Sequence, residues 1–273
     1  MTRFTVVGGR GFVGSHLVRR LRAEGHDCEV PERGADLGGR DLGIVIYAAG
    51  VTADFRRRPL DAIEAHVTSF IDVVKRARYD TMLYLSSTRV YRYGNGTTEE
   101  APIVVRPSEA DDVYAISKCM GESVALTIAR DCRVARLSNV YGPDVKSDNF
   151  LSSITRDAVR DKHVLLHSTL DSAKDYIGVD EVCELLIRIA LSGRERVYNV
   201  ASGISTTHRE IANEIARLTG ATFDVAADAA VVRDAPIDVR RVQSELDFAA
   251  APLTQRLGEV VAAFQQDAER HGR

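Results

Sequence analysis

Several features that mark other classes of protein are absent from this sequence. Its four cysteines form no Cys-x-x-Cys pair and no zinc-type spacing, so we expect a reduced, cytoplasmic protein without a metal site. Lysine is scarce, and the formal net charge of −3 gives no overall positive field that would attract nucleic acid. No apolar stretch approaches the ~18 residues of a membrane span, and we expect no signal peptide.

What the sequence does contain is a glycine-rich segment close to the N-terminus. It follows a short apolar run, Phe4–Val7, and precedes a segment in which Leu17, Val18 and Leu21 share one face of a predicted helix. Glycines between a strand and a helix let the backbone approach a dinucleotide pyrophosphate, which the helix N-terminus attracts. The spacing is Gly-x-x-Gly-x-x-Gly, so a glycine-rich turn without a ligand is the alternative. The predicted cofactor contacts here are Gly8, Arg10, Gly11, Phe12, Val13 and Gly14.

Charged residues around the expected ribose site leave the choice of dinucleotide open. Glu32 lies near the end of a probable second strand, Cys28–Pro31, where an acid would bond the ribose hydroxyls and favour NAD. Arg33 and Arg10 favour NADP, since a guanidinium pairs well with its 2′-phosphate. A solvated surface charge is the alternative for each of the three. We therefore expect NAD or NADP as the cofactor, with Glu32 favouring NAD.

Strand and helix patterns alternate through the first two-thirds of the chain. This alternation predicts an α/β fold, a doubly wound parallel sheet of the Rossmann type with helices on both faces. Only ten residues separate Glu32 from the next strand, so we expect the second helix to be missing and a third strand, Ala35–Leu37, to be vestigial. The predicted strands are Phe4–Val7, Cys28–Pro31, Gly43–Ala48, Met82–Ser86, Arg133–Leu137 and Val197–Val200, and the main helices are Leu60–Arg78, Asp112–Arg130 and Val182–Leu191.

The pattern loosens from about Pro143. Thr207 and Glu210 form a capping box that opens a helix ending at Gly220, and a strand, Thr222–Val225, and a C-terminal helix, Thr254–Glu269, follow. We interpret this part as a smaller, interleaved C-terminal lobe that binds the substrate. The expected division is 1–142 plus about 175–200 for the dinucleotide-binding domain, and about 143–174 plus 201–273 for the substrate-binding lobe.

Tyr114 and Lys118 are four residues apart in a predicted helix and therefore share one face. An ammonium next to a phenol favours the phenolate, so we expect Lys118 to lower the pKa of Tyr114 from about 10 toward working pH. Such a tyrosine can exchange a proton with a substrate hydroxyl while hydride moves to or from nicotinamide. A pair of this kind can also arise by chance, so its surroundings matter.

Two strand ends supply those surroundings. The strand Met82–Ser86 leads into hydroxyl side chains at the sheet edge where ligands bind in open α/β folds, and a hydroxyl there can bond the substrate oxygen. A strand-end hydroxyl without a catalytic role is the alternative. The strand before it ends in small residues that suit close approach of the cofactor, namely Ala48, Ala49 and Gly50.

Together these segments resemble the extended short-chain dehydrogenase/reductases, in particular the nucleotide-sugar epimerase/dehydratase group. The resemblance follows the family's order over about 200 residues. Its motifs are GGRGFVGSHL (8–17), VIYAAG (45–50), LSSTRVY (85–91), YAISKCMGE (114–122), RLSNVYGP (136–143), KDYIGVDEV (174–182) and YNVASG (198–203).

The resemblance implies roles for individual residues. A catalytic serine, tyrosine and lysine would be Ser87, Tyr114 and Lys118, the last two also contacting the cofactor. Asp36 and Leu37 are similar to the family's pair around the adenine. The implied substrate contacts are Ser87, Thr88, Asn139, Lys174 and, in a looser alignment, Arg233, of which Asn139 and Lys174 correspond to contacts with the diphosphate.

Two positions depart from the family's pattern. Family dehydratases carry an acid pair directly after the catalytic residue, whereas this chain has Thr88 and Arg89, so the resemblance argues against 4,6-dehydration. The helix position usually held by asparagine is His66, on the apolar face beside Ile63 and Phe70. We expect His66 to pack in the core, with a catalytic role as the alternative.

We therefore expect an NAD(P)-dependent oxidoreductase that acts on a nucleotide-linked sugar, as a 4-epimerase or a 4-keto reductase. The alternatives are a catalytically silent dinucleotide-binding sensor or scaffold, and a reductase of a non-sugar carbonyl. The helices Leu60–Arg78 and Asp112–Arg130 resemble those that form a four-helix dimer interface in the family, so we expect a homodimer.

Overall fold

The computed structural model describes residues 1–51 and 54–271, and the chain divides into two units. The first unit comprises Met1–Ser138, Val179–Val200 and Asp238–Phe248, and the second comprises Asn139–Gly178, Ala201–Ile237 and Ala249–Arg273. The predicted division differs from this one mainly at Asp238–Phe248. That segment belongs to the first unit because its short helix, α8 (Arg240–Leu246), packs against β9 (Val197–Val200).

A six-stranded sheet forms the centre of the first unit, in the order β2-β1-β3-β4-β5-β9. All of its strand pairs are parallel. This confirms the doubly wound α/β fold and the predicted return of Val197–Val200 to the main sheet. The remaining strands are β1 (Arg3–Val7), β2 (Asp27–Glu29), β3 (Ile44–Tyr47), β4 (Thr81–Ser87) and β5 (Cys132–Leu137).

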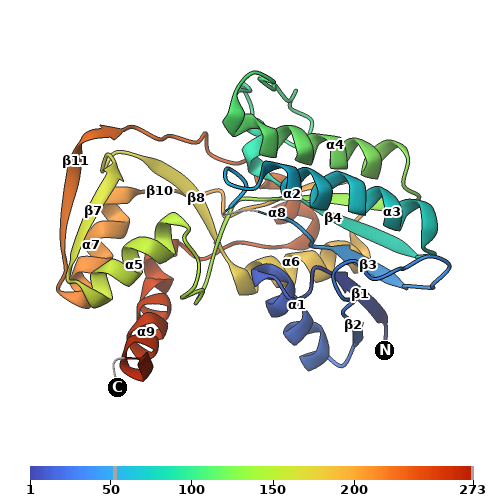
Figure 1. Cartoon of the computed structure of the whole chain (residues 1–273), viewed down its shortest axis with the longest axis horizontal. Coiled ribbons are helices and arrows are strands. Elements are labelled where there is room, and N and C mark those ends of the chain that lie inside the picture. Colours follow the sequence, from blue (N-terminus) through green and yellow to red (C-terminus); the bar gives the residue numbers. More distant parts are fainter. Residues whose placement is uncertain (52–53, 272–273) are drawn as a thin grey trace. The chain divides into compact units, whose positions relative to one another are not determined.

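Helices cover both faces of this sheet (Figure 1). On one face α1 (Phe12–Ala23) packs beside α6 (Val179–Ser192). On the other face α4 (Val113–Thr127) packs against β4 and β5 and lies next to the predicted Leu60–Arg78 helix. The apolar strands are therefore covered on both sides, as a parallel sheet requires.

The predicted Leu60–Arg78 helix changes its winding in the middle. It consists of α2 (Pro59–Ile63), a π-helical turn η1 (Glu64–Thr68) and α3 (Ser69–Arg76). Two tyrosine hydroxyls from the sheet donate to carbonyls of the wide turn, that of Tyr47 to Ala65 and that of Tyr84 to His66. Side-chain donors thus satisfy carbonyl groups in the turn that carries His66.

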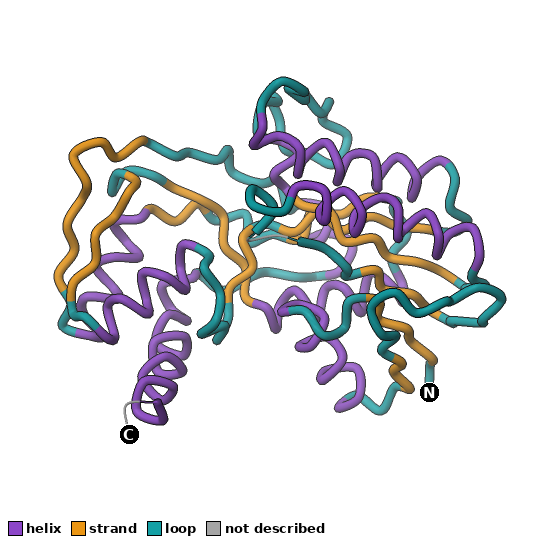
Figure 2. Tube along the Cα trace, viewed as in Figure 1, coloured by secondary structure: helices purple, strands orange, loops and turns teal. Residues whose placement is uncertain are grey.

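Between β2 and β3 the chain forms neither a helix nor a strand (Figure 2). The predicted absence of the second helix is confirmed, but the vestigial strand expected at Ala35–Leu37 does not form. Gly34 and Gly39 have left-handed backbone, with φ of 77° and 70°, and turn the chain on either side of this stretch. Leu37 is buried in the core, so the loop folds onto the sheet instead of extending beside β2.

The second unit has its own hydrophobic core. Its helices α5 (Phe150–Arg160), α7 (His208–Thr219) and α9 (Leu253–His271) pack together around residues such as Leu257 and Ile211. The predicted capping box of Thr207 and Glu210 is present, and the helix ends at a left-handed Gly220. The strands are β6 (Asn139–Tyr141), β8 (Ala173–Gly178) and β10 (Ser205–Thr207) in one sheet, and β7 (His163–Ser168) with β11 (Thr222–Ala230) in another.

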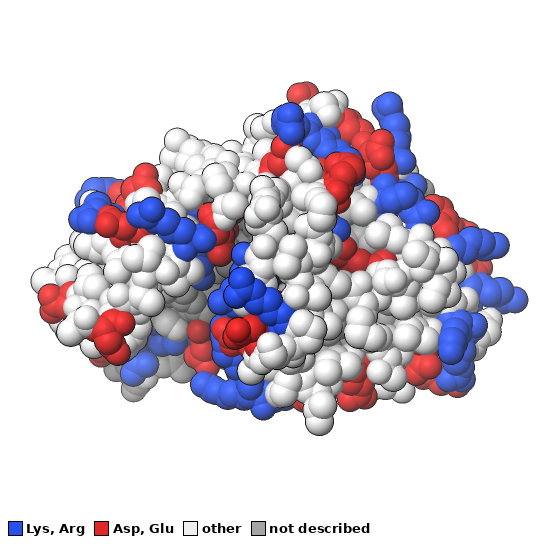
Figure 3. All heavy atoms as spheres, turned by 90° about the horizontal axis from the view of Figure 1, so that it is seen from above, with Lys and Arg blue, Asp and Glu red and all other residues white. Residues whose placement is uncertain are grey.

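Charged side chains of both signs are mixed on the face of the molecule drawn in Figure 3. Figure 3 shows Lys and Arg lying next to Asp and Glu in small groups, separated by wide uncharged areas. All four cysteines are free thiols. In the part of the chain that the structure describes, no helix combines the length and the apolar character needed to cross a membrane.

Candidate active site

The glycine-rich turn lies against the end of β3. Gly8 has φ of 85°, and a Cβ there would lie 2.5 Å from the backbone nitrogen of Ala49. A Cβ on Gly14 would lie 2.3 Å from the carbonyl oxygen of Gly8, so the first turn of α1 packs directly on the glycine turn. Gly11 gives α1 no side-chain cap, and the first N–H groups of a helix have no intrahelical acceptor. This glycine cradle (Gly8, Gly11 and Gly14) fits a dinucleotide pyrophosphate.

Gly50 connects the glycine cradle with the predicted catalytic helix. It follows Ala49, and a Cβ on Gly50 would lie 3.0 Å from Nε2 of His66 and 3.6 Å from Nζ of Lys118. Nζ of Lys118 donates a hydrogen bond of 2.8 Å to the carbonyl oxygen of Leu85, near the end of β4. The cradle and α4 therefore meet at the carboxyl edge of the sheet, where open α/β sheets bind their ligands.

The hydroxyls of Ser87 and Tyr114 lie close enough to interact. Burial raises the pKa of Tyr114 to about 12, although the Ser87 hydroxyl and the charge of Arg89 act in the opposite direction. The expectation that Lys118 lowers this pKa is therefore wrong for the chain by itself. Nζ of Lys118 lies 5.9 Å from the centroid of the Tyr114 ring, and desolvation of the phenolate outweighs the neighbouring charges. At neutral pH the phenol is protonated.

Burial also shifts the pKa of the Lys118 amine. Burial lowers the pKa of Lys118 to about 7, and the charge of Glu122 one turn further along α4 opposes this shift. The lysine therefore loses its proton near neutral pH, because the buried ammonium is poorly solvated.

We expect wild-type protein to gain stability over a Lys118→Met variant as the pH rises from 7 to about 9. The folded-state pKa of about 7 lies below the ordinary lysine pKa of 10.5, so the unfolded chain binds more protons in this window and unfolding becomes less favourable. The expected gain is about 2 kcal/mol. Urea unfolding of cofactor-free protein at each pH measures it, and a constant difference between the two proteins would contradict the shift.

His66 is fully buried, in agreement with the expected core packing. Its Nδ1 lies 2.9 Å from Oγ of Ser117, and its ring meets the Tyr114 ring edge-on at 5.2 Å. Nε2 is buried without a hydrogen-bond partner in the described part of the chain. Burial, with the charge of Lys118, lowers the pKa of His66 to about 2. The imidazole is therefore neutral.

The residues predicted around the ribose and adenine lie at the trimmed edge of the sheet. Nη2 of Arg10 lies 2.6 Å from Oε1 of Glu32, and both side chains are largely exposed. Arg33 is exposed as well. Asp36 accepts from the backbone N–H of Gly38 and pairs with Arg76 at 2.9 Å. Glu32, the acid expected to favour NAD, thus pairs with Arg10, one of the two arginines expected to favour NADP.

We expect Glu32→Gln to shift the dinucleotide preference toward NADP by about tenfold. The change removes a carboxylate that would repel the 2′-phosphate and frees the Arg10 guanidinium to bind it. Fluorescence titration with NADH and NADPH gives the ratio of dissociation constants. Glu259→Gln is the control for simple loss of a surface carboxylate, because the Glu259 side chain is 71% exposed and lies 3.2 Å from Arg256, outside the predicted site. An unchanged ratio in Glu32→Gln would show that this acid does not face the ribose.

Beneath Ser87 and Lys118 lies a buried ion pair that the sequence did not reveal. Arg136 of β5 and Glu122 of α4 are each 4% exposed, with Nη2 of the arginine 2.7 Å from Oε2 of the glutamate. Ser86 donates to Glu122, and Arg136 also donates to the hydroxyl of Tyr91. The pair ties α4 to both central strands. Its one sequence signal is the spacing of Glu122, four residues after Lys118 on the same helix face.

The other predicted substrate contacts are distributed over both units. Thr88 is half-buried in a short turn, η2 (Thr88–Tyr91), directly after Ser87 in the first unit. Asn139, Lys174 and Arg233 belong to the second unit, where Nδ2 of Asn139 donates to the carbonyl oxygen of Asp175. Arg233 forms a bridge with Ala173, the residue before Lys174. The roles of these residues in substrate binding stay predictions.

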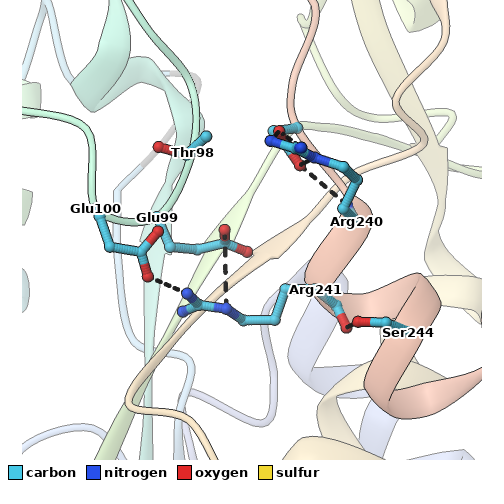
Figure 4. A pocket seen from close by; sticks show the side chains of 7 residues that line it. Thr98, Glu99, Glu100, Arg240, Arg241 and Ser244 are labelled. Atoms are coloured by element: carbon cyan, nitrogen blue, oxygen red, sulfur yellow. Dashed lines mark hydrogen bonds and ion pairs between the residues drawn. The ribbon is translucent and has the colours of Figure 1, made fainter.

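A separate pocket of about 240 Å³ lies in the first unit, away from the predicted residues. Figure 4 shows Arg241 of α8 pointing toward Glu99 and Glu100 from a neighbouring segment. Arg240 in turn pairs with Asp238. Because its charged groups are largely paired with one another, we interpret this pocket as a contact that holds α8 on the first unit. In residues 1–51 and 54–271, no cluster of His, Cys, Asp and Glu has the arrangement of a metal site.

Comparison with known proteins agrees with this geometry. Residues 4–201 match the model of the NAD dependent epimerase/dehydratase family. The GDP-6-deoxy-D-mannose reductase of Pseudomonas aeruginosa is 28% identical over 271 residues, which cover 88% of this chain and 87% of the relative.

Solved structures give the same picture of the fold. The structure of RMD from Pseudomonas aeruginosa complexed with NADPH matches with a TM-score of 0.81 at 23% identity. The match covers 97% of this chain and 100% of the RMD chain. The structure of MoeE5 in complex with UDP-glucose and NAD has a TM-score of 0.80 at 21% identity, covering 97% and 99%.

The fold and the site thus define an enzyme of the NAD(P)-dependent, extended short-chain dehydrogenase/reductase type. The chain belongs to the NAD dependent epimerase/dehydratase family. This confirms the resemblance seen in the sequence, the enzyme class and the nicotinamide dinucleotide cofactor, and the choice between NAD and NADP stays open.

Proposed function

We propose that the protein reduces the 4-keto group of a nucleotide-linked sugar with NAD(P)H. The observation that carries this proposal is the placement of Ser87, Tyr114 and Lys118 together at the edge of the sheet where the glycine cradle ends. The similar Pseudomonas protein named as a GDP-6-deoxy-D-mannose reductase supports the reaction type. The neighbour solved with UDP-glucose supports a nucleotide sugar as the substrate.

The proton chemistry follows from the state of Tyr114. When bound, the nicotinamide supplies a hydride to the carbonyl carbon. The raised pKa keeps the Tyr114 hydroxyl protonated, so it can donate its proton to the carbonyl oxygen as negative charge develops there. Ser87 holds the same oxygen through its hydroxyl. Lys118 is anchored on Leu85 and borders Gly50, where it would hold the ribose of the cofactor.

A 4-epimerase is the second candidate, because the family's description names epimerases. An epimerase must hold its dinucleotide through two hydride steps, whereas a reductase releases it in each turnover. The missing helix between β2 and β3 leaves less protein over the adenine side, which favours release. Purified protein that consumes NADPH with a 4-keto sugar nucleotide, and carries no bound NAD, would support the reductase. Stoichiometric bound NAD would support the epimerase instead.

Two further alternatives have their own tests. A catalytically silent sensor or scaffold gains support if Tyr114→Phe leaves every detectable activity unchanged. A reductase of a non-sugar carbonyl gains support if no nucleoside diphosphate stabilises the protein thermally. Asn139, Lys174 and Arg233 are the residues that we propose for binding the diphosphate part of the substrate, so their substitution should weaken that stabilisation.

We also propose that the protein is a homodimer. Apolar side chains remain exposed on the two helices that cover one face of the sheet, with Leu60 at 76% and Met120 at 51%. These helices lie side by side and could pair with the same helices of a second copy (Figure 1). Light scattering after gel filtration should give twice the chain mass, and a monomer would overturn this proposal.

A further inference from the structure

An arginine with incomplete pairing lies beside the catalytic tyrosine. The backbone N–H of Arg89 donates to Oγ of Ser87 at 3.3 Å. The ring centroid of Phe55 lies 5.0 Å from Cζ of Arg89 and also 5.0 Å from the ring centroid of Tyr114. The Arg89 charge acts to lower the pKa of Tyr114. A cation therefore borders the position of the reacting group.

The charges around Arg89 do not balance it. Within the described residues, Asp111 is the carboxylate that three arginines approach. Arg56 binds it with two hydrogen bonds of 2.6 and 2.9 Å, while Arg92 and Arg89 lie at 3.7 and 3.9 Å. Nε of Arg89 is buried without a hydrogen-bond partner in the described chain. Burial, with the charges of Arg92 and Arg56, lowers the pKa of Arg89. Such a cation is stabilised when an anion binds.

We propose that Arg89 binds a carboxylate at C6 of the sugar, so that the substrate is a nucleotide-linked hexuronic acid or its 4-keto form. This inference rests on the proposed function, in which the C4 oxygen meets Tyr114. C6 is attached to C5, the ring carbon next to C4, so it is the substituent nearest to the reacting position on that side of the ring. A guanidinium offers a carboxylate two parallel donors, and a neutral sugar would leave this cation with only its long contact to the shared Asp111. A negatively charged residue at this position would instead repel a uronic acid.

The test compares a matched pair of substrates that differ only at C6. The ratio of kcat/KM for UDP-glucuronate over UDP-glucose, measured with NAD, is determined for wild type, Arg89→Gln and Arg57→Gln. If UDP does not bind, glucuronate and glucose linked to guanosine diphosphate or thymidine diphosphate replace the two UDP sugars. Arg57 is the matched control, because its side chain is 79% exposed and pairs with Asp54 at 3.9 Å. UDP without a sugar is titrated against all three proteins.

We expect Arg89→Gln to lower the ratio about 10- to 100-fold and Arg57→Gln to leave it unaltered. An equal loss of kcat/KM with both sugars would overturn the proposal, because Arg89 would then act only through its charge on Tyr114. Weaker binding of UDP itself to Arg89→Gln would assign the cation to the diphosphate and also overturn it. A wild-type preference for UDP-glucose refutes the carboxylate site while the proposed function stands. If no nucleotide or nucleotide sugar binds, the proposed function itself fails.

Discussion

Replacing Tyr114 by phenylalanine should lower turnover by about 10²- to 10⁴-fold, the usual contribution of a positioned general acid. The ring fills a buried site between Phe55 and His66, so the variant keeps its packing and loses the hydroxyl that lies near Ser87. The dissociation constant for the nucleotide should change little, and that for the dinucleotide should rise only slightly, because Tyr114 is one of many expected cofactor contacts. The effect therefore falls on kcat.

The measurement is steady-state consumption of NADPH with a 4-keto nucleotide sugar, together with cofactor titration of the same preparation. Tyr93→Phe is the control, since Tyr93 is half-buried and contacts Arg92 and Arg106 away from Ser87. It should retain activity within about twofold, as expected of a peripheral substitution. Loss of cofactor binding together with activity in Tyr114→Phe would point to a structural role for the hydroxyl.

Replacing Arg136 by methionine should cost about 3–5 kcal/mol of folding stability. The arginine is the cation of a buried pair, and without it Glu122 keeps only the bond from Ser86 among the side-chain contacts described above. By itself burial lowers the pKa of Arg136, but the hydrogen bonds and charge of Glu122 raise it overall. The cost of the variant is mainly that of an uncompensated buried carboxylate.

A double-mutant cycle separates that cost from lost packing. Glu122→Met removes the other charge, and the double variant should be more stable than Arg136→Met because both desolvated charges are gone. Urea unfolding of the four proteins supplies the free energies. Strictly additive losses would mean that the two side chains contribute independently, contrary to the short contact between them.

The dinucleotide half of the site follows closely from the sequence because its geometry is local. Gly8 and Gly14 lie in one turn between a strand and a helix, and the backbone alone determines their close contacts. Tyr114 and Lys118 are brought to one face by helix periodicity. The segment after Glu32 is too short for a helix, and this prediction was correct. The strand predicted at Ala35–Leu37 was wrong, because turns at the flanking glycines and burial of Leu37 fold this segment onto the sheet.

The second unit was less readable. Its helix α5 and strands β6, β7 and β8 lie in a region where the hydrophobic pattern is loose. Pairing there joins distant segments, as in the parallel contact of β7 with β11. Asp238–Phe248 joins the first unit through the packing of α8 on β9, which no local pattern predicts. Such contacts depend on chain topology rather than on residue spacing.

The sequence by itself determined which chemical groups are present and the order in which the strands and helices deliver them. The tertiary structure alone decided how those groups behave. Burial raises the pKa of Tyr114, against the direction that its spacing from Lys118 suggested, and lowers the pKa of Lys118. It also joins Arg136 to Glu122 and, among the residues that the structure describes, leaves Nε of Arg89 without an acceptor. Desolvation depends on every atom packed around a group, and those atoms come from distant parts of the chain.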